Sequence, residues 1–322
     1  MKILVTGGAG YLGNVLVRKL LKANHEVMVV DIGTFGYGAL EGVPVQIVKG
    51  DIRNINNLEN VDIVMHLASI VGDAACDLDM NGTIDINLKA TGNLAKLCKK
   101  FDKKLIYAST CSVYGENPGK MSTENDETVT PISLYGQTKL KSEKLIKDSG
   151  CEYIIMRLGT LYGLSHRMRF DLVINLFAAK AIVGEKLTVF GGEQWRPFCH
   201  IDDASNAFVQ AINWKSGSVF NIANGNFKII DIAKEISDNT NSGYEVSRDI
   251  EDRRDYIVSI KKIMESGWKP RKTIRDAVVE IQTAYNLGFW KDYKNPIYSN
   301  YKLHFQNIEM MKKLYTEGSI VG

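Results

Sequence analysis

Two side chains in this sequence are spaced to move a proton. Tyr135 and Lys139 stand four residues apart in the segment Tyr-Gly-Gln-Thr-Lys. On a helix this spacing brings both side chains to one face, with their Cβ atoms about 5–6 Å apart. A neighbouring ammonium favours the phenolate and lowers the pKa of a tyrosine, which makes it a usable base near neutral pH. The pair therefore predicts removal of a proton from an alcohol that a nicotinamide oxidises.

A glycine-rich segment at the start of the chain supports this interpretation. Residues 2–6 predict a short buried strand, and residues 14–23 predict an amphipathic helix. Between them lie Gly7, Gly10 and Gly13. Glycines permit a tight turn, and the N-terminus of the following helix offers free N–H groups to a pyrophosphate. The segment predicts a dinucleotide site, whereas the Tyr–Lys spacing alone also arises on helices where the tyrosine packs and the lysine is solvated.

An acidic residue indicates which dinucleotide binds. The second predicted strand ends in Asp31, about twenty residues beyond the loop, where a carboxylate would bind the adenosine ribose hydroxyls. It would repel a 2′-phosphate, and no Arg or Lys lies between Asp31 and Val48 to receive one. The sequence favours NAD over NADP. The alternative is that Asp31 only caps a turn.

A third segment links these motifs to a known family. Residues 108–115 read Ala-Ser-Thr-Cys-Ser-Val-Tyr-Gly. Together with the glycine segment and the Tyr135/Lys139 pair, they resemble the extended short-chain dehydrogenase/reductases, in their nucleotide-sugar epimerase/dehydratase branch. The resemblance runs from Met1 to about Leu287. It implies NAD as cofactor, a nucleoside-diphosphate sugar as substrate and a homodimer as the assembly.

The resemblance implies a cofactor contact for each residue that matches the family's pattern. Asp51 and Ile52 look like its adenine contact, Leu67 and Ala68 like the strand under the cofactor, and Asn87 like the asparagine of its central helix. Singly, Asp51 could be an ordinary strand-end acid and Asn87 a polar group on a helix side. The implied cofactor residues are Gly7, Gly10, Tyr11, Leu12, Gly13, Asp31, Asp51, Ile52, Leu67, Ala68, Asn87, Tyr135 and Lys139.

The resemblance also implies a third catalytic residue, Thr110, at the family's Ser/Thr position. Its hydroxyl would bridge the substrate alcohol and Tyr135. Thr110 could instead be an ordinary strand-end threonine, with Ser109 or Ser112 as rival hydroxyls. Family members that dehydrate sugars follow this threonine with Asp-Glu, but here Cys111 and Ser112 follow it. Neither is a competent general acid and base at pH 7, so oxidation at C4 without dehydration is favoured.

Three functions remain open at this point. If the oxidised sugar is reduced again on its other face, the enzyme is a 4-epimerase, which we favour. If the 4-keto sugar is released, the enzyme is a C4 dehydrogenase. A non-catalytic NAD-binding sensor is disfavoured, because Tyr135 and Lys139 are both present.

Substrate contacts are implied mainly in the second half of the chain. Arg196 and Arg254, preferred over Arg253, resemble the family's phosphate-binding arginines, although either could form an ion pair between domains. Thr160 replaces an asparagine found in many relatives, which puts that contact in doubt. The loop 165–171 is expected along the nucleotide and sugar, or as a basic surface loop. The implied substrate residues are Thr110, Tyr135, Thr160, Arg169, Asp171, Arg196 and Arg254.

Composition narrows the partners. The chain has 322 residues, 45% of them hydrophobic, and a net charge of only +3. No nucleic-acid partner is expected, because the Lys-rich stretch 140–147 fits a solvated helix face. No apolar run is long enough to span a membrane, and glycines interrupt the apolar run at the N-terminus. A cytoplasmic protein is therefore expected. The five cysteines show no metal-binding spacing, so reduced thiols and no metal site are expected.

The order of predicted elements indicates the fold class. Strand-like runs lie at 2–6, 26–31, 45–48, 62–67, 104–109 and 153–158. Their alternation with helical segments predicts an α/β fold, a Rossmann-type doubly wound parallel sheet. We expect an NAD-binding domain at 1–163 with re-entry near 200–212, and a smaller α/β substrate-binding region at 164–287. The aromatic-rich extension 288–322 is expected to pack as a lid, a domain clasp or a dimer arm.

Overall fold

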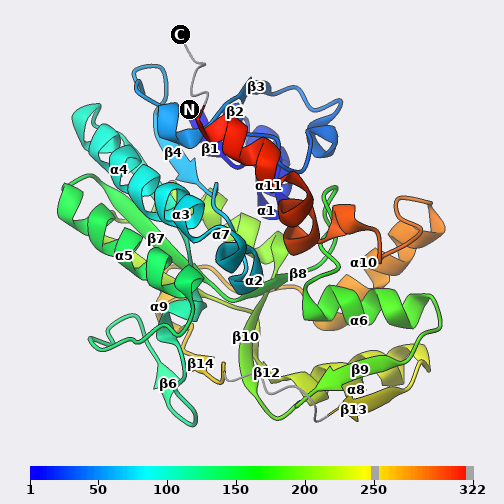
Figure 1. The fold of residues 1–322 in the computed structure, drawn as a ribbon. Coiled ribbons are helices and arrows are strands. Elements are labelled where there is room, and N and C mark those ends of the chain that lie inside the picture. The colour runs from blue at the N-terminus through cyan, green and yellow to red at the C-terminus, as the bar shows by residue number, and fades with distance from the viewer. Residues whose placement is uncertain (248–253, 317–322) are drawn as a thin grey trace.

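A seven-stranded parallel sheet forms the centre of the computed structural model, which describes residues 1–247 and 254–316, with side chains as far as 308 (Figure 1). Its strand order is β11-β7-β5-β4-β1-β2-β3, and every neighbouring pair is parallel. The strands are β1 (Lys2–Thr6), β2 (Glu26–Asp31), β3 (Gln46–Lys49), β4 (Ile63–His66), β5 (Lys104–Thr110), β7 (Tyr153–Leu158) and β11 (Ser218–Ile222). The predicted Rossmann-type fold class is confirmed.

Both faces of this sheet are covered, which explains the continuous apolar runs of its strands. Successive residues of β1 point to opposite sides, so Ile3 and Val5 join one core and Leu4 joins another. The first core is covered by α1 (Tyr11–Lys22) and α7 (Ile201–Ala211), which pack against each other. The second is covered by α4 (Thr91–Lys100) and α5 (Leu134–Ser149).

The strand order reverses between the neighbouring strands β1 and β4. The chain continues from β1 toward one edge of the sheet and from β4 toward the other. In doubly wound sheets a crevice forms at this point, outside the carboxyl ends of the strands, and ligands bind there. The glycine segment follows β1, and residues 67–73 follow β4. The fold thus brings two predicted cofactor segments to one edge.

A second region lies beside the large sheet, around its own hydrophobic core (Figure 1). Its three-stranded sheet has the order β12-β10-β8, and β13 pairs with β9. The elements of this region are β8 (Thr160–Tyr162), α6 (Val173–Ile182), β9 (Leu187–Phe190), β10 (Trp195–His200), β12 (Gly225–Lys228), α8 (Ile229–Thr240), β13 (Tyr244–Ser247) and α10 (Ile274–Asn286). Shorter elements are α2 (Asp73–Leu78), α3 (Met80–Thr83), β6 (Met121–Ser122), β14 (Ile257–Val258) and α9 (Lys261–Glu265).

The chain returns to the large sheet further along than the sequence suggested. The expected return at 200–212 coincides with α7, but β11 also pairs with β7 at the edge of the large sheet. This strand lies within 164–287, the range that the sequence assigns to the smaller region. The four residues Val219 to Ile222 are buried as an edge strand, and so short a run does not reveal from sequence which sheet it joins.

The described part of the C-terminal extension packs onto both regions of the protein. Trp290 and Tyr293 are buried in the core of the second region. The chain then enters α11 (Asn300–Thr316), which packs against α2 beside the large sheet. The extension therefore contacts both regions.

Three further observations concern the described residues. None of their helices combines the length and apolar character needed to cross a bilayer. No group of three or more His, Cys, Asp and Glu among them is arranged to hold a metal ion. All five cysteines are buried free thiols.

Candidate active site

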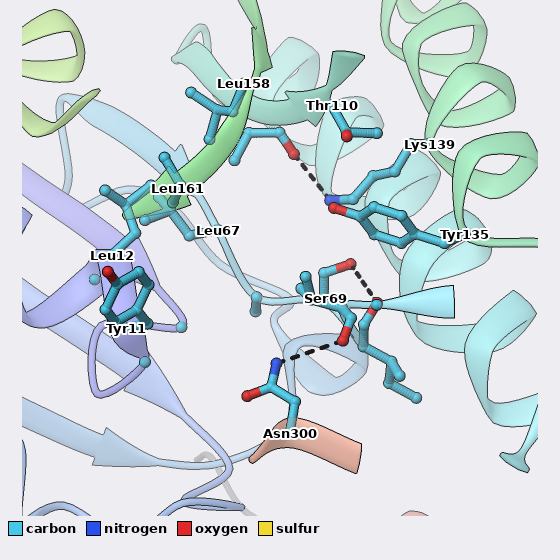
Figure 2. A pocket seen from close by; sticks show the side chains of 18 of the residues that line it. Tyr11, Leu12, Leu67, Ser69, Thr110, Tyr135, Lys139, Leu158, Leu161 and Asn300 are labelled. Atoms are coloured by element: carbon cyan, nitrogen blue, oxygen red, sulfur yellow. Dashed lines mark hydrogen bonds between the residues drawn. The ribbon is translucent and has the colours of Figure 1, made fainter. Parts of the chain in front are cut away.

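A cavity of about 330 Å³ lies at the carboxyl edge of the large sheet. Figure 2 shows the glycine-loop residues Tyr11 and Leu12 on one side and Tyr135 and Lys139 on the other. The predicted cofactor residues that line it are Gly7, Gly10, Tyr11, Leu12, Gly13, Asp31, Asp51, Ile52, Leu67, Ala68, Tyr135 and Lys139. The predicted substrate residues that line it are Thr110, Tyr135, Thr160, Arg169 and Arg254.

The glycine loop is a backbone cradle that side chains would fill. A Cβ atom on Gly13 would lie 2.1 Å from the carbonyl oxygen of Gly7, closer than real Cβ contacts allow. Gly7 has φ +73°, and its Cβ would lie 2.7 Å from the backbone nitrogen of Ala68. Helix α1 begins after Gly10 with no side-chain cap and no acid in its first turn. Its first N–H groups lack intrahelical partners, so the cradle fits the pyrophosphate of a dinucleotide.

Asp31 lines the cavity and also caps a turn. Its Oδ1 accepts a hydrogen bond from the Gly33 N–H (2.8 Å), and its Oδ2 accepts one from the Ala9 N–H (2.9 Å). Burial raises the pKa of Asp31, and these two bonds oppose that rise. Asp51, also in the cavity wall, is paired with Arg53 at 2.7 Å.

Three predicted catalytic residues meet in the same cavity (Figure 2). Tyr135 lies in the first turn of α5, and Lys139 lies one turn later. The Lys139 Nζ donates a hydrogen bond to the Ala108 carbonyl at 2.8 Å. Thr110 ends β5, and its Oγ1 accepts a hydrogen bond from the Ser112 N–H at 3.1 Å. That bond fixes the threonine oxygen and leaves its proton for another acceptor.

The protonation of the pair differs from the expectation. Burial raises the pKa of Tyr135; Cys76 and Asp73 add to the rise, whereas Thr110 opposes it. Burial also lowers the pKa of Lys139 to about 7. The four-residue spacing predicts that Lys139 lowers the tyrosine pKa, but in a buried site desolvation disfavours both charged forms. The protein residues alone do not make Tyr135 a strong base.

A buried ion pair beneath the cavity supports the catalytic helix. Glu143 follows Lys139 by one more turn of α5 and pairs with Arg157 of β7 at 2.8 Å, with both side chains at most 4% exposed. Glu143 also accepts a hydrogen bond from the hydroxyl of Ser109, next to Thr110. These contacts fix α5 against β5 and β7. Sequence reasoning missed Glu143, although its four-residue spacing from Lys139 was a visible signal.

The two phosphate-binding candidates differ in position. Arg254 lines the cavity, and its guanidinium pairs with the Asp73 carboxylate at 3.0 Å. An ion pair is the alternative role that the sequence allows for this arginine. Arg196 does not line the cavity; its guanidinium lies 5.5 Å from the ring centroid of Tyr256, which does. Arg253 lies outside the described residues.

The loop 165–171 lies against the glycine helix rather than free on the surface. Ser165 donates a hydrogen bond to the Tyr11 carbonyl at 2.8 Å. Arg167 is 7% exposed, lines the cavity and stacks on Phe35 at 3.8 Å from its ring centroid. The loop therefore contributes Arg167 and Arg169 to the cavity wall.

Two other predicted residues act behind the cavity surface. Asn87 does not line it; its amide instead bonds the segment that follows β4. Its Oδ1 accepts hydrogen bonds from the Ile70 N–H and the Ser69 hydroxyl, both at 2.8 Å. Asp171 is also absent from the wall, because both of its oxygens pair with Arg169 at 3.0 Å. Both residues shape segments that do line the cavity.

Sequence reasoning missed several residues of the wall. Five examples are Phe35, Asp73, Arg167, Tyr256 and Asn300. Arg167 belongs to the loop already suspected. The other four carry no local signal, because long-range packing brings them to the cavity.

The two positions that follow Thr110 contain no acid and base pair. The Cys111 thiol is buried away from the cavity and donates a hydrogen bond to the Arg157 carbonyl at 3.2 Å. Burial raises the pKa of Cys111, so it remains protonated. Ser112 lines the cavity but has no acidic group. The geometry thus agrees with the expectation that dehydration is disfavoured.

Comparison with known proteins gives matches to one family, with relatives that include UDP-glucose 4-epimerases and UDP-glucuronic acid decarboxylases. The sequence model of the NAD-dependent epimerase/dehydratase family matches residues 3–223. A Methanocaldococcus jannaschii protein, provisionally named UDP-glucose 4-epimerase, is 31% identical over 297 residues, which cover 87% of this chain and 96% of the relative.

Two solved structures show the same fold. UDP-glucose 4-epimerase of Thermotoga maritima, solved with UDP-glucose, has a TM-score of 0.80 and 26% identity, over 90% of this chain and 100% of that one. UDP-glucuronic acid 4-epimerase of Bacillus cereus, solved with UDP-glucuronic acid and NAD, has a TM-score of 0.78 and 29% identity, over 89% and 99%.

Proposed function

This chain belongs to the NAD-dependent epimerase/dehydratase family, and we propose that it inverts the configuration at C4 of a nucleoside-diphosphate sugar, with NAD as cofactor. One observation carries the proposal. The cavity combines a glycine cradle with Tyr135, Lys139 and Thr110, while Cys111 points away from it. A dinucleotide site and a proton-transfer group are therefore present without a dehydration pair.

We assign the roles of the catalytic residues as follows. Thr110 orients the C4 hydroxyl of the sugar and passes its proton toward Tyr135. When bound, NAD supplies an acceptor for the C4 hydride and a cationic ring that favours the phenolate. Lys139 holds the nicotinamide ribose with the protons not used by Ala108. Tyr135 returns the proton when the sugar is reduced on its other face.

The substrate class rests on the relatives. The two solved relatives bind UDP-glucose and UDP-glucuronic acid, which makes UDP-sugars the first candidates. Arg254 and Arg169 line the cavity wall, each beside the carboxylate that it pairs with, and we assign these two guanidinium groups to the diphosphate. We further propose that the enzyme is a homodimer in the cytoplasm. Light scattering of the purified protein tests the dimer.

A substrate panel tests the function. Purified protein is incubated with UDP-, GDP-, CDP- and dTDP-sugars, and both the NADH absorbance and the sugar configuration are followed. We expect a C4 epimer without NADH accumulating in excess of enzyme. A released 4-keto sugar with enzyme-bound NADH would instead identify a C4 dehydrogenase. Bound NAD without turnover of any sugar would identify a non-catalytic NAD-binding protein.

A further inference from the structure

The cavity wall contains an arginine that has no counter-charge among the described residues. The guanidinium of Arg167 is buried and forms no ion pair with them, and its Nε and Nη2 atoms have no hydrogen-bond partner. Arg169, in the same loop, differs, because its Nε and Nη2 both pair with Asp171 at 3.0 Å. A buried charge without a partner is costly, so Arg167 is suited to an anion that the protein does not itself supply.

One nitrogen of this guanidinium can reach a ligand in the cavity. Nη1 forms no hydrogen bond within the part of the chain that the structure describes, and unlike Nε and Nη2 it is not fully buried. The guanidinium carbon lies 3.8 Å from the ring centroid of Phe35, which holds the group in place. Burial, with a smaller effect of Arg169, lowers the pKa of Arg167 to about 9, so it stays protonated at neutral pH. Arg167 therefore presents a positive charge to the cavity.

Hydrogen bonds fix the loop around Arg167 to the first turn of α1. The Ser165 hydroxyl donates to the Tyr11 carbonyl and accepts a hydrogen bond from the Asn14 Nδ2, both at 2.8 Å. The backbone N–H of Arg167 donates to the same hydroxyl at 3.3 Å. The arginine is thus anchored beside the helix N-terminus, whose free N–H groups suit a pyrophosphate.

Phe35 shows which side of the cavity Arg167 belongs to. It stands four residues after Asp31, the carboxylate assigned to the adenosine ribose. Arg167 therefore contacts the segment after Asp31, while its loop is bonded to the first turn of α1. In a dinucleotide bound to these two segments, the group that follows the adenosine ribose is the pyrophosphate. It is the anionic part of NAD.

We infer that Arg167 is a cofactor-binding residue, whose guanidinium pairs with the pyrophosphate of NAD. The loop 165–171 then binds the cofactor through Arg167, two residues before Arg169, which we assign to the substrate. The inference rests on the NAD part of the proposed function and requires no particular sugar.

Binding measurements on nucleotide-free protein test the inference. NAD and ADP-ribose are titrated calorimetrically into wild type, Arg167→Met and Arg167→Lys. The methionine removes the charge but keeps an aliphatic chain against Phe35. We expect the Kd values for both ligands to rise about ten- to hundredfold in Arg167→Met, because a hydrogen bond between charged groups is lost. The loss should be smaller in Arg167→Lys, which keeps the charge but not the planar group.

Two controls make the binding test specific. Adenosine has no phosphate, so its Kd, measured by ligand-observed NMR, should stay within twofold in Arg167→Met. Arg275→Gln removes an exposed arginine of α10 and should change none of the Kd values. An equal rise for adenosine and NAD in Arg167→Met would overturn the inference, because it would indicate a general distortion of the site.

The stability of the nucleotide-free protein gives an independent readout. Since Arg167 is buried without a counter-charge, Arg167→Met should raise the Tm by a few degrees when NAD is absent. Saturating NAD should raise the Tm of wild type more than that of Arg167→Met. A lower Tm without NAD, together with an unchanged Kd for NAD, would show that Arg167 only packs on Phe35 and would overturn the inference.

The remaining outcomes separate the inference from the function. If the Kd for UDP-glucose of NAD-loaded protein rises in Arg167→Met while the Kd for NAD does not, Arg167 binds the substrate diphosphate and the inference is wrong. If wild type binds NAD and Arg167→Met binds it equally well, only the inference fails. If wild type binds neither NAD nor ADP-ribose, the NAD part of the proposed function and the inference both fail.

Discussion

The Nζ atom of Lys139 lies 5.9 Å from the ring centroid of Tyr135, one turn along helix α5. Burial raises the tyrosine pKa and lowers the lysine pKa to about 7, so it disfavours the charged form of each group. A phenolate at Tyr135 therefore needs more positive charge than Lys139 provides. The site as a whole, including its cofactor, has to activate the base.

Replacing Tyr135 tests its role in proton transfer. Tyr135→Phe removes only the hydroxyl, so turnover should fall by about 10²–10⁴, the usual contribution of general acid–base catalysis. Thr110→Ala should lower turnover less, and Thr110→Ser least, because only the hydroxyl is needed. Steady-state kinetics with the accepted sugar gives these values, and circular dichroism confirms folding. Near-wild-type turnover of Tyr135→Phe would exclude it as the base.

The depressed pKa of Lys139 predicts a pH-dependent stability. The unfolded lysine binds a proton below pH about 10.4, whereas the folded one binds it only below about 7. The resulting destabilisation is complete below pH 7 and disappears as pH rises toward 10.4. Lys139→Met should therefore raise the Tm of nucleotide-free protein by a few degrees at pH 6 and by much less at pH 9.5. Equal Tm differences at both pH values would contradict the shift.

The buried ion pair of Glu143 and Arg157 should stabilise the folded protein. Glu143→Gln leaves a buried arginine without its counter-charge, which should lower the free energy of unfolding by about 3–5 kcal/mol. Urea denaturation measures the change. Asp148→Asn, on the exposed side of the same helix, is the matched control and should change stability by less than about 0.5 kcal/mol. A loss below about 1 kcal/mol in Glu143→Gln would argue against a supporting role.

Asp31 should select NAD over NADP. Its carboxylate lies in the cavity wall, and placing it against a 2′-phosphate should cost more than about 1.4 kcal/mol, a tenfold difference in Kd. Titration of both cofactors into stripped protein should show NAD binding at least tenfold more tightly. Asp31→Asn should reduce the difference between the Kd values for NAD and NADP, because it removes the negative charge that repels the 2′-phosphate. Equal affinities in wild type would mean that Asp31 does not face the adenosine ribose.

Local patterns predicted the parts of this molecule that depend on local chemistry. The six strand-like runs correspond closely to six strands of the large sheet, and the Tyr135/Lys139 spacing lies on one helix, because periodicity and glycine content act over short distances. Asn300 could not be predicted, since it reaches the cavity only through packing of the C-terminal extension on distant elements. The pKa of Tyr135 also depends on burial, which a four-residue spacing does not reveal.

The central claim is that hydrogen removed from C4 returns to the same carbon on its other face. A sugar nucleotide accepted in the substrate panel is prepared with deuterium at C4 and incubated with NAD-loaded enzyme. Mass spectrometry and NMR then locate the label in the product. We predict a C4 epimer that keeps deuterium at C4. Unlabelled 4-keto product with deuterium on the nicotinamide, or deuterium moved to C6, would contradict the claim.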